Sequence, residues 1–325
     1  MKRVLSVFLP AMMLLISGPV FAEQVLKAGH VLAPGSQFGA AITAMNEVLQ
    51  KELGGKIRIQ EYPASALGAG GAMLKNVELG TQDILISSAG GALGDFNPPV
   101  GILDLMLLFR DNAHAYAVLD GPIGKELLDT FKDKGMVGLA WAENGFRHLT
   151  NSKHPIRVPD DLKGIKIRLS ESTIYKDAFK TLGAEPFSLP FAQVYQALQS
   201  GQADAQENPI TTIVSAKLQD VQKFFTFSNH TYAPAAILIN KEIFEEFDPA
   251  TQAALRKAAV AGAVASREFV RKSDEAGLAK LKESGVAINT DFDRAAFEKA
   301  LEPFYQSYSK QFPMDKIMAI KNTKS

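Results

Sequence analysis

Residues 25–86 decide the fold class, and they read VLKAGHVLAPGSQFGAAITAMNEVLQKELGGKIRIQEYPASALGAGGAMLKNVELGTQDILI. Apolar, strand-like stretches lie at 25–31, 57–62 and 84–86, and helical spacing of apolar residues lies at 38–49 and 73–79. Glycines end both helical stretches. A strand, helix, strand, helix and strand within about 60 residues predict an α/β layer with mostly parallel strands.

The same alternation returns further along the chain. Strands are predicted at 137–141, 165–168, 203–205 and 235–239, and helices at 172–182, 191–200 and about 211–218. No Ser-rich or Pro-rich linker separates the two α/β units. We therefore expect two lobes joined by several crossings of the chain.

An Ala-rich helical pattern runs from Pro249 to about Glu283. At ~1.5 Å per residue this helix would be about 50 Å long, enough to extend across both lobes. We expect the first lobe to comprise residues 23–145 and 235–272, and the second lobe residues 146–234 and 273–325.

The N-terminus has the pattern of a secretory signal peptide at residues 1–22. Lys2 and Arg3 precede an apolar run at 4–16, and small residues lead to a cleavage site between Ala22 and Glu23. A membrane anchor is the alternative, but the run is short of the ~20 residues that span a bilayer. We expect cleavage, export to the periplasm and a mature chain with a net charge of −2, since Lys2 and Arg3 are lost from balanced totals of 35 bases and 35 acids.

The composition excludes several classes of protein. The near-zero charge lacks the basic footprint of a general nucleic-acid binder. The absence of cysteine excludes disulfides, thiol nucleophiles, Cys-based metal sites and a lipidated N-terminal cysteine. The glycine loop at 68–71 lacks the remaining residues of a dinucleotide fingerprint or a P-loop, and the five histidines contain no i,i+4 pair. We expect no cofactor and no metal site.

Two arginines indicate where an anion would bind. Arg168 lies in the apolar strand at 165–169, where alternation places it on one face with Lys166. Arg147 lies just beyond the strand predicted at 137–141. For any single arginine a structural ion pair is the default interpretation, but two guanidinium groups at strand ends also fit the bidentate capture of a small carboxylate.

Several segments together resemble the solute-binding proteins of tripartite ATP-independent periplasmic (TRAP) transporters, the DctP-like family. They are LKGIKIR at 162–168, PFAQVYQALQSGQADAQENP at 190–209, YPASALG at 62–68, NGFR at 144–147 and VQKFF at 221–225. The resemblance covers about residues 26–304. It implies an α/β, two-lobed periplasmic binding protein fold with a mixed sheet in each lobe and a long helix spanning both lobes.

The resemblance also implies a ligand, a partner and a set of site residues. The ligand would be a small organic acid, such as a C4-dicarboxylate or a sugar acid, and the partner would be a membrane permease. Arg168 would pair with the ligand carboxylate, Arg147 and Asn208 would lie beside it, and Phe191 would supply an apolar wall. We expect a monomer that closes on its ligand and has no contact with nucleic acid.

Four further residues complete the candidate ligand-binding set. His30 ends the first predicted strand, and ligands in open α/β sheets lie at the carboxyl ends of strands. Ser88 ends the strand at 84–86, where sialic-acid-binding relatives carry an acid, so the resemblance disfavours sialic acid as the ligand. Trp141 and Glu143 precede Arg147.

Two other classes of function stay open. A secreted enzyme acting on a carboxylated substrate could use Glu143 or His30 as its acid–base group, although the sequence marks no nucleophile. A structural or adhesive exported protein would show no lobe closure.

Overall fold

The computed structural model describes residues 23–325, so the predicted signal peptide lies outside the described residues. Within that range nine strands form one sheet in the order β2-β1-β3-β8-β4-β7-β5-β6, and β9 pairs with β8. The strands are β1 (Gln24–Gly29), β2 (Ile57–Tyr62), β3 (Ile84–Ser88), β4 (Met136–Asn151), β5 (Lys166–Leu169), β6 (Glu185–Ser188), β7 (Ala205–Asn208), β8 (Phe224–Asn240) and β9 (Ala287–Asn289).

The first lobe, defined here as the part built on β1, β2 and β3, follows from the opening alternation of the sequence. β1 pairs in parallel with both β2 and β3, as predicted, whereas β3 pairs antiparallel with β8. The connecting helices are α1 (Gln37–Leu53) and α2 (Gly70–Glu78). Gly54, with φ 61°, ends α1 in the left-handed conformation that glycine adopts without strain.

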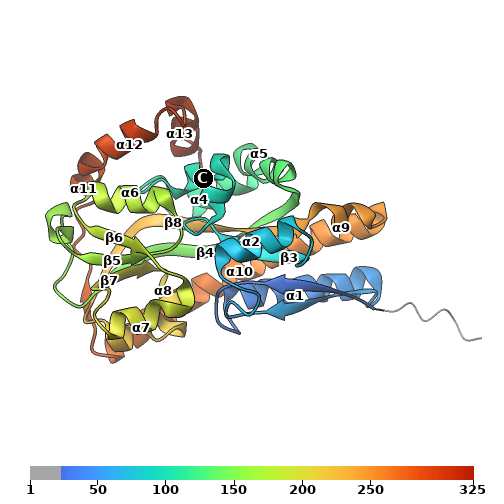
Figure 1. Ribbon diagram of the computed structural model, residues 1–325, viewed down its shortest axis with the longest axis horizontal. Helices are drawn as coiled ribbons and strands as arrows, with labels where there is room; N and C mark the ends of the chain where they lie inside the picture. Colours follow the sequence, from blue (N-terminus) through green and yellow to red (C-terminus); the bar gives the residue numbers. More distant parts are fainter. Residues whose placement is uncertain (1–22) are drawn as a thin grey trace, which may run out of the picture.

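The second lobe, defined as the part built on β5, β6 and β7, repeats this arrangement (Figure 1). β5 pairs in parallel with β6 and β7. Its helices are α6 (Thr173–Thr181), α7 (Val194–Gln199) and α8 (Ile210–Ser215). Short 3-10 helices precede or connect these elements at η3 (Pro159–Leu162), η4 (Phe191–Gln193) and η5 (Leu218–Val221).

The two longest strands join the lobes, and both are longer than the sequence predicted. β4 has 16 residues and β8 has 17, and they pair antiparallel from one lobe into the other. The expected strands at 137–141 and 235–239 are only the first-lobe parts of β4 and β8. Gly145 and Pro234 read as strand breaks, but the ladder accommodates them through a register shift between Glu143 and Gly145.

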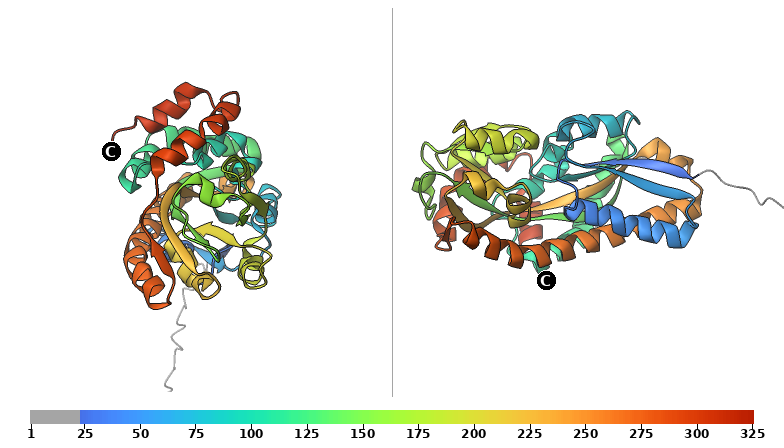
Figure 2. Two further views of the ribbon diagram at one scale, coloured as in Figure 1. Left: turned by 90° about the vertical axis from the view of Figure 1, so that its left-hand side faces the viewer. Right: turned by 90° about the horizontal axis from the view of Figure 1, so that it is seen from below.

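The long helix α10 (Pro249–Glu283) has the predicted bounds and runs along both lobes (Figure 2). Pro249 occupies its first turn, and the Asp248 side chain caps it by accepting hydrogen bonds from the backbone N–H groups of Ala250 and Thr251. Its small residues allow close packing against α1, β4 and α8. α9 (Lys241–Glu246) connects β8 to α10.

The remaining helices pack around the sheet. They are α3 (Leu93–Phe96), η1 (Pro98–Asp104), α4 (Asn112–Asp120), α5 (Pro122–Asp129), η2 (Thr130–Lys134), α11 (Arg294–Ala300), α12 (Glu302–Tyr308) and α13 (Met314–Lys321). Of these, α4 contacts α10 through a 2.7 Å ion pair between Asp120 and Arg267. The C-terminal α13 returns to the central region, where Lys316 pairs with Glu126 of α5 at 3.0 Å. Within residues 23–325 no helix combines the length and apolar character needed to cross a membrane.

The contact between α10 and α1 depends on Gly262. A Cβ atom at this position would lie 2.8 Å from Met45 Cγ and 2.9 Å from the Ala41 carbonyl oxygen. Gly262→Ala should therefore lower the free energy of unfolding by about 1–3 kcal/mol through overpacking, although alanine is the better helix former. Urea unfolding measures this change. Val264→Ala, on the exposed side of α10, is the control and should leave the free energy of unfolding unchanged or slightly raised. If Gly262→Ala instead stabilises the protein, α1 and α10 can move apart without an energetic cost, which would contradict the prediction.

Candidate functional site

A cavity of about 70 Å³ lies where the two lobes meet. Residues that follow β1 and β3 line it from the first lobe, and residues at or just beyond the ends of β5, β6 and β7 line it from the second. The carboxyl ends of parallel strands are where α/β proteins usually bind ligands.

The structure brings five of the eight predicted site residues together around this cavity. Arg168, Arg147, Asn208, Phe191 and Ser88 all line it. They come from β5, β4, β7, the segment after β6 and the end of β3, so positions up to 120 residues apart converge. The arrangement places two guanidinium groups in one small cavity.

The Arg168 side chain is buried without a counter-ion. Its Nε and one terminal nitrogen both donate to the Leu189 carbonyl oxygen, at 2.9 and 2.5 Å, and the residue is 2% exposed. Within residues 23–325 no carboxylate makes an ion pair with it. Burial lowers the pKa of Arg168 to about 10, while the charges of Glu207 and Glu171, which form no direct ion pair with it, act in the opposite direction, so the group still carries its proton at neutral pH. A buried cation in this state lacks the counter-charge that usually offsets the loss of its solvation.

Arg147 has a different electrostatic role, because its charge is already compensated. Its guanidinium forms a bidentate, buried ion pair with Glu207 and a 3.1 Å hydrogen bond to Asn208 Oδ1. Burial alone would raise the pKa of Glu207, but the Arg147 charge and hydrogen bonds from His230 and Arg147 lower it to about 2. The sequence interpretation that Arg147 lies beyond a strand is wrong, since β4 continues to Asn151.

Three predicted residues are not among those that line the cavity. His30 Nε2 lies 2.9 Å from Glu61 Oε1, and burial lowers the pKa of His30. The Trp141 indole N–H donates to the Gly124 carbonyl oxygen within the core. Glu143 accepts a 2.7 Å hydrogen bond from Tyr116, and burial raises its pKa to about 7. His30 Nε2, the Trp141 indole N–H and one Glu143 oxygen each have a partner inside a lobe or at the β4 crossing, whereas His30 Nδ1 and Glu143 Oε1 are buried without a hydrogen-bond partner.

Other cavity residues went unrecognised at the level of sequence. Asn144, Ser170, Glu171 and Gly70 line the same space. Asn144 belongs to the same NGFR motif as Arg147, so the sequence did contain a signal that it could lie at the site. Ser170 and Glu171 follow β5 in a polar turn of the kind that is normally solvent-exposed, and nothing in their spacing distinguished them.

The segment after β5 also holds the two lobes against each other. Glu171 Oε2 accepts a 3.0 Å hydrogen bond from the Gly71 N–H, and Thr173 bonds to Asp95. Ser172 donates to Asp104 Oδ2 at 2.8 Å, and the other oxygen of Asp104 accepts from the Gly90 N–H at 2.6 Å. Burial raises the pKa of Asp104 to about 7, and the hydrogen bonds from Ser172 and Gly90 offset part of the rise.

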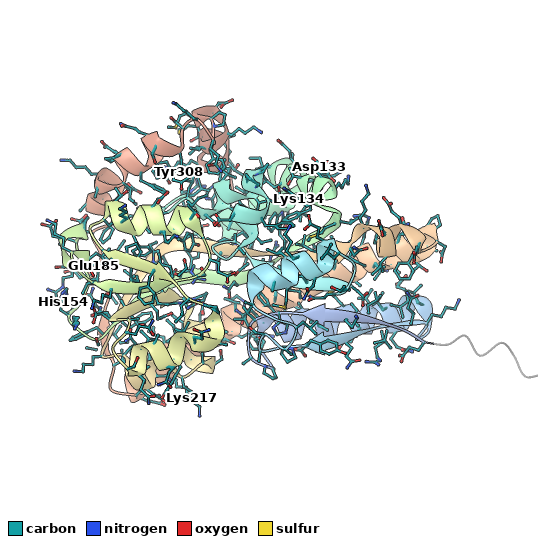
Figure 3. All side chains as sticks on the ribbon, in the orientation of Figure 1. Asp133, Lys134, His154, Glu185, Lys217 and Tyr308 are labelled. Carbon is teal, nitrogen blue, oxygen red and sulfur yellow. The ribbon has the colours of Figure 1, made fainter. Side chains whose placement is uncertain are left out.

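A larger hollow lies elsewhere and lacks these features. About 420 Å³ in volume, it lies between η1, α5 and α13 and is mostly apolar. Its charged lining residues, Glu126 and Lys316, pair with each other. Within residues 23–325 no group of three His, Asp or Glu side chains is arranged to hold a metal ion. The two buried arginines, Arg147 and Arg168, line the cavity between the lobes and not this hollow. His154, at the outer edge of the second lobe, lies far from it (Figure 3).

Two α/β lobes with a buried cation between them define a solute-binding protein of the periplasmic type. A family profile described as "Bacterial extracellular solute-binding protein, family 7" matches residues 28–311. The chain therefore belongs to this family, and it is a solute-binding protein of the TRAP transporter class.

Relatives with known names support the same assignment. A solute-binding protein of Verminephrobacter eiseniae is 42% identical over 291 residues, which cover 90% of this chain and 87% of the relative. The 2,3-diketo-L-gulonate-binding periplasmic protein of Escherichia coli is 39% identical, with 86% of this chain and 85% of the relative covered. A TRAP periplasmic solute-binding protein of Polaromonas sp. JS666, solved with bound D-erythronate, is 38% identical with a TM-score of 0.91, covering 93% of this chain and all of the other.

The Arg147–Glu207 pair should be a structural requirement. Glu207→Gln leaves the buried guanidinium without its counter-ion, so the free energy of unfolding should fall by about 3–5 kcal/mol. Chemical denaturation measures the loss. Glu78→Gln removes one partner of an exposed ion pair with Lys75 and is the control, for which we expect less than about 1 kcal/mol. Equal effects of the two substitutions would contradict the assignment.

Asp104 should make stability depend on pH. Its pKa of about 7 in the folded protein lies above the value of about 4 for an unfolded aspartate, so between these values the folded protein holds a proton that the unfolded chain has released. The free energy of unfolding should therefore fall as pH rises through this window, by about 2–4 kcal/mol from this group. Asp104→Asn should flatten the pH profile of thermal unfolding; parallel profiles for the variant and the wild type would rule this out.

Proposed function

We propose that this protein is an extracytoplasmic receptor that binds one small organic acid by closure of its two lobes and delivers it to the membrane permease of a TRAP-type transporter. The single observation that carries the proposal is Arg168, a buried cation without a counter-ion that faces the cavity between the lobes. An organic carboxylate supplies the missing charge and two acceptor oxygens for the guanidinium.

The names of the relatives favour the same chemistry. 2,3-Diketo-L-gulonate and D-erythronate, which two of them are named for or solved with, are both small acids with a single carboxylate. Binding of such an acid by this chain would use Arg168 as the primary contact. Arg147 would remain paired with Glu207 and hold Asn208 in place, and Phe191 would shield the ligand from water.

Closure would occur about the strands that join the lobes. We propose the boundaries 23–145 with 235–272 for the first lobe and 146–234 with 273–325 for the second, because they fall at the register shift of β4 near Gly145 and beside Pro234 of β8. Hinges of this kind lie where a few residues absorb the backbone change. The closed surface is what a permease would recognise, and we propose that the receptor acts as a monomer in the periplasm.

An enzymatic role has less support. Its two acid–base candidates, Glu143 and His30, are hydrogen-bonded to Tyr116 and Glu61 and are not among the residues that line the cavity. General acid–base catalysis requires such a group within hydrogen-bonding reach of the substrate.

Arg168→Ala should weaken the binding of an organic acid by about a hundredfold or more, because it removes one partner of a buried ion pair. Arg168→Lys should also lose affinity, since an ammonium cannot make the bidentate contact. Isothermal titration calorimetry against C4-dicarboxylates, sugar acids and 2-oxo acids measures both effects.

Arg58→Ala, which removes an exposed partner of Glu23, is the control for charge and should bind as the wild type does. In contrast to Glu207→Gln, the Arg168→Ala variant should unfold at a similar or higher denaturant concentration than the wild type, because the charge that it removes is unpaired. Unchanged affinity in Arg168→Ala would refute the proposed function.

A further inference from the structure

The charged side chains that face the cavity limit the charge that a ligand can carry. Arg147 is neutralised by Glu207, which leaves Arg168 as the free positive charge. A second acid, Glu171, also lines the cavity and makes no ion pair within residues 23–325. The cavity therefore presents one available cation and one available anion.

Glu171 lies at the mouth of the cavity, between the inner space and an outer groove. Both spaces have Glu171 in their lining, and the outer groove also contains Lys75, Glu78, Asp95 and Lys134. Lys134 lies close to α2 on this side of the molecule (Figure 3). A part of a ligand that extends from Arg168 toward this outer groove would pass the Glu171 carboxylate.

The first turn of α2, on the opposite wall of the cavity, leaves room for the Glu171 carboxylate. The Glu171 Oε2 atom accepts the hydrogen bond from Gly71 N, and a Cβ atom added at Gly71 would lie only 3.3 Å from it. At Gly70 the corresponding distance is 3.6 Å. The two glycines of the Gly70-Gly71 pair thus let an acid from the second lobe stand against the first turn of α2.

Unused hydrogen-bonding groups surround the same space. Glu171 Oε1 makes no hydrogen bond within residues 23–325, and neither do the side-chain hydroxyls of Ser87 and Ser88, which line the cavity from β3. A carboxylate oxygen accepts hydrogen bonds and cannot donate them at neutral pH, whereas serine hydroxyls do both. These groups match a ligand portion that carries hydroxyls, and Glu171 repels a portion that carries a second negative charge.

We infer that Glu171 is a specificity-determining residue that restricts the site to acids with one carboxylate and neighbouring hydroxyl groups, and that it rejects dicarboxylates. This inference rests on the proposed function, since Arg168 must hold the first carboxylate. A monocarboxylate pairs with Arg168 and donates a hydroxyl hydrogen bond to Glu171. A second carboxylate at that place would meet a like charge in a partly desolvated site, where the repulsion is much stronger than in water.

The test compares acids of equal carbon number that differ in charge. D-Erythronate and succinate form a four-carbon pair, and D-galactonate and galactarate form a six-carbon pair. Calorimetric titration of the full mature protein at pH 7.5 should show that the wild type prefers the monocarboxylate of the pair it binds by about tenfold or more. Glu171→Gln keeps the size of the side chain and an acceptor for Gly71 N, and it should reduce that preference by about tenfold, mainly by strengthening dicarboxylate binding.

Glu78→Gln is the matched control, because Glu78 lines the outer groove but not the cavity. It should leave the preference within about threefold of the wild-type value, the effect expected of a distant, screened charge. Thermal unfolding of both variants establishes that each is folded before titration.

Three results overturn the inference. The first is a wild type that binds the dicarboxylate and the monocarboxylate of a pair with equal affinity. The second is a Glu171→Gln variant whose preference is unchanged. In both cases the proposed function still holds if Arg168→Ala abolishes acid binding. If no acid of either pair and none of the wider panel of C4-dicarboxylates, sugar acids and 2-oxo acids binds to the wild type, the proposed function fails together with the inference.

Discussion

The unpaired charge of Arg168 is the constraint on which the rest of the site depends. Removing an ion from water costs several kcal/mol unless a counter-charge and hydrogen bonds replace the solvent. Here the guanidinium obtains only the Leu189 carbonyl, while Arg147 beside it is fully paired with Glu207. The fold has therefore compensated one buried cation and left its neighbour exposed to the cavity. Under the proposed function, an anion that enters would complete the electrostatics of this small cavity.

The two strands that join the lobes also determine where this constraint lies. β4 and β8 run continuously from one lobe to the other, and β4 carries Arg147 two residues beyond the register shift at Gly145. Gly145 has φ 120°, and a Cβ atom there would lie 3.2 Å from Val270 of α10 and 3.3 Å from Pro209. Gly145 of β4 is thus packed between α10 and the turn after β7, and β7 carries Asn208. Because β4 bears Arg147 of the candidate site, the proposed movement of the lobes would be coupled to the geometry around the ligand.

The sequence predicted the elements whose signals are local. The α10 helix has the predicted bounds, because Pro249 and the Ala-rich pattern that follows it lie within one continuous stretch of sequence. The alternation around Arg168 placed it on one face with Lys166. In the structure Lys166 is exposed and Arg168 is buried. The difference arises because other elements of the fold cover Arg168, which the local pattern does not indicate. Glu207 stood next to Asn208 in a quoted motif, yet its pairing with Arg147, 60 positions away, is a tertiary contact. Glu171 could not be recognised, because its role depends on the absence of side chains at Gly70 and Gly71 across the cavity.

The contacts between the lobes carry a second electrostatic cost, which acts on closure and not on the ligand. Asp104 is buried where Ser172 meets it, and burial raises its pKa to about 7, so the ionised form opposes the closed arrangement. A small carboxylic acid has a pKa near 4 and stays charged over the range in which Asp104 takes up a proton. Mild acidification therefore removes the cost at Asp104 while the attraction between Arg168 and its ligand persists. A ligand shifts the equilibrium between open and closed forms only by its difference in affinity for the two, and under the proposed closure that difference would add to a closing energy that the protonation of Asp104 adjusts separately.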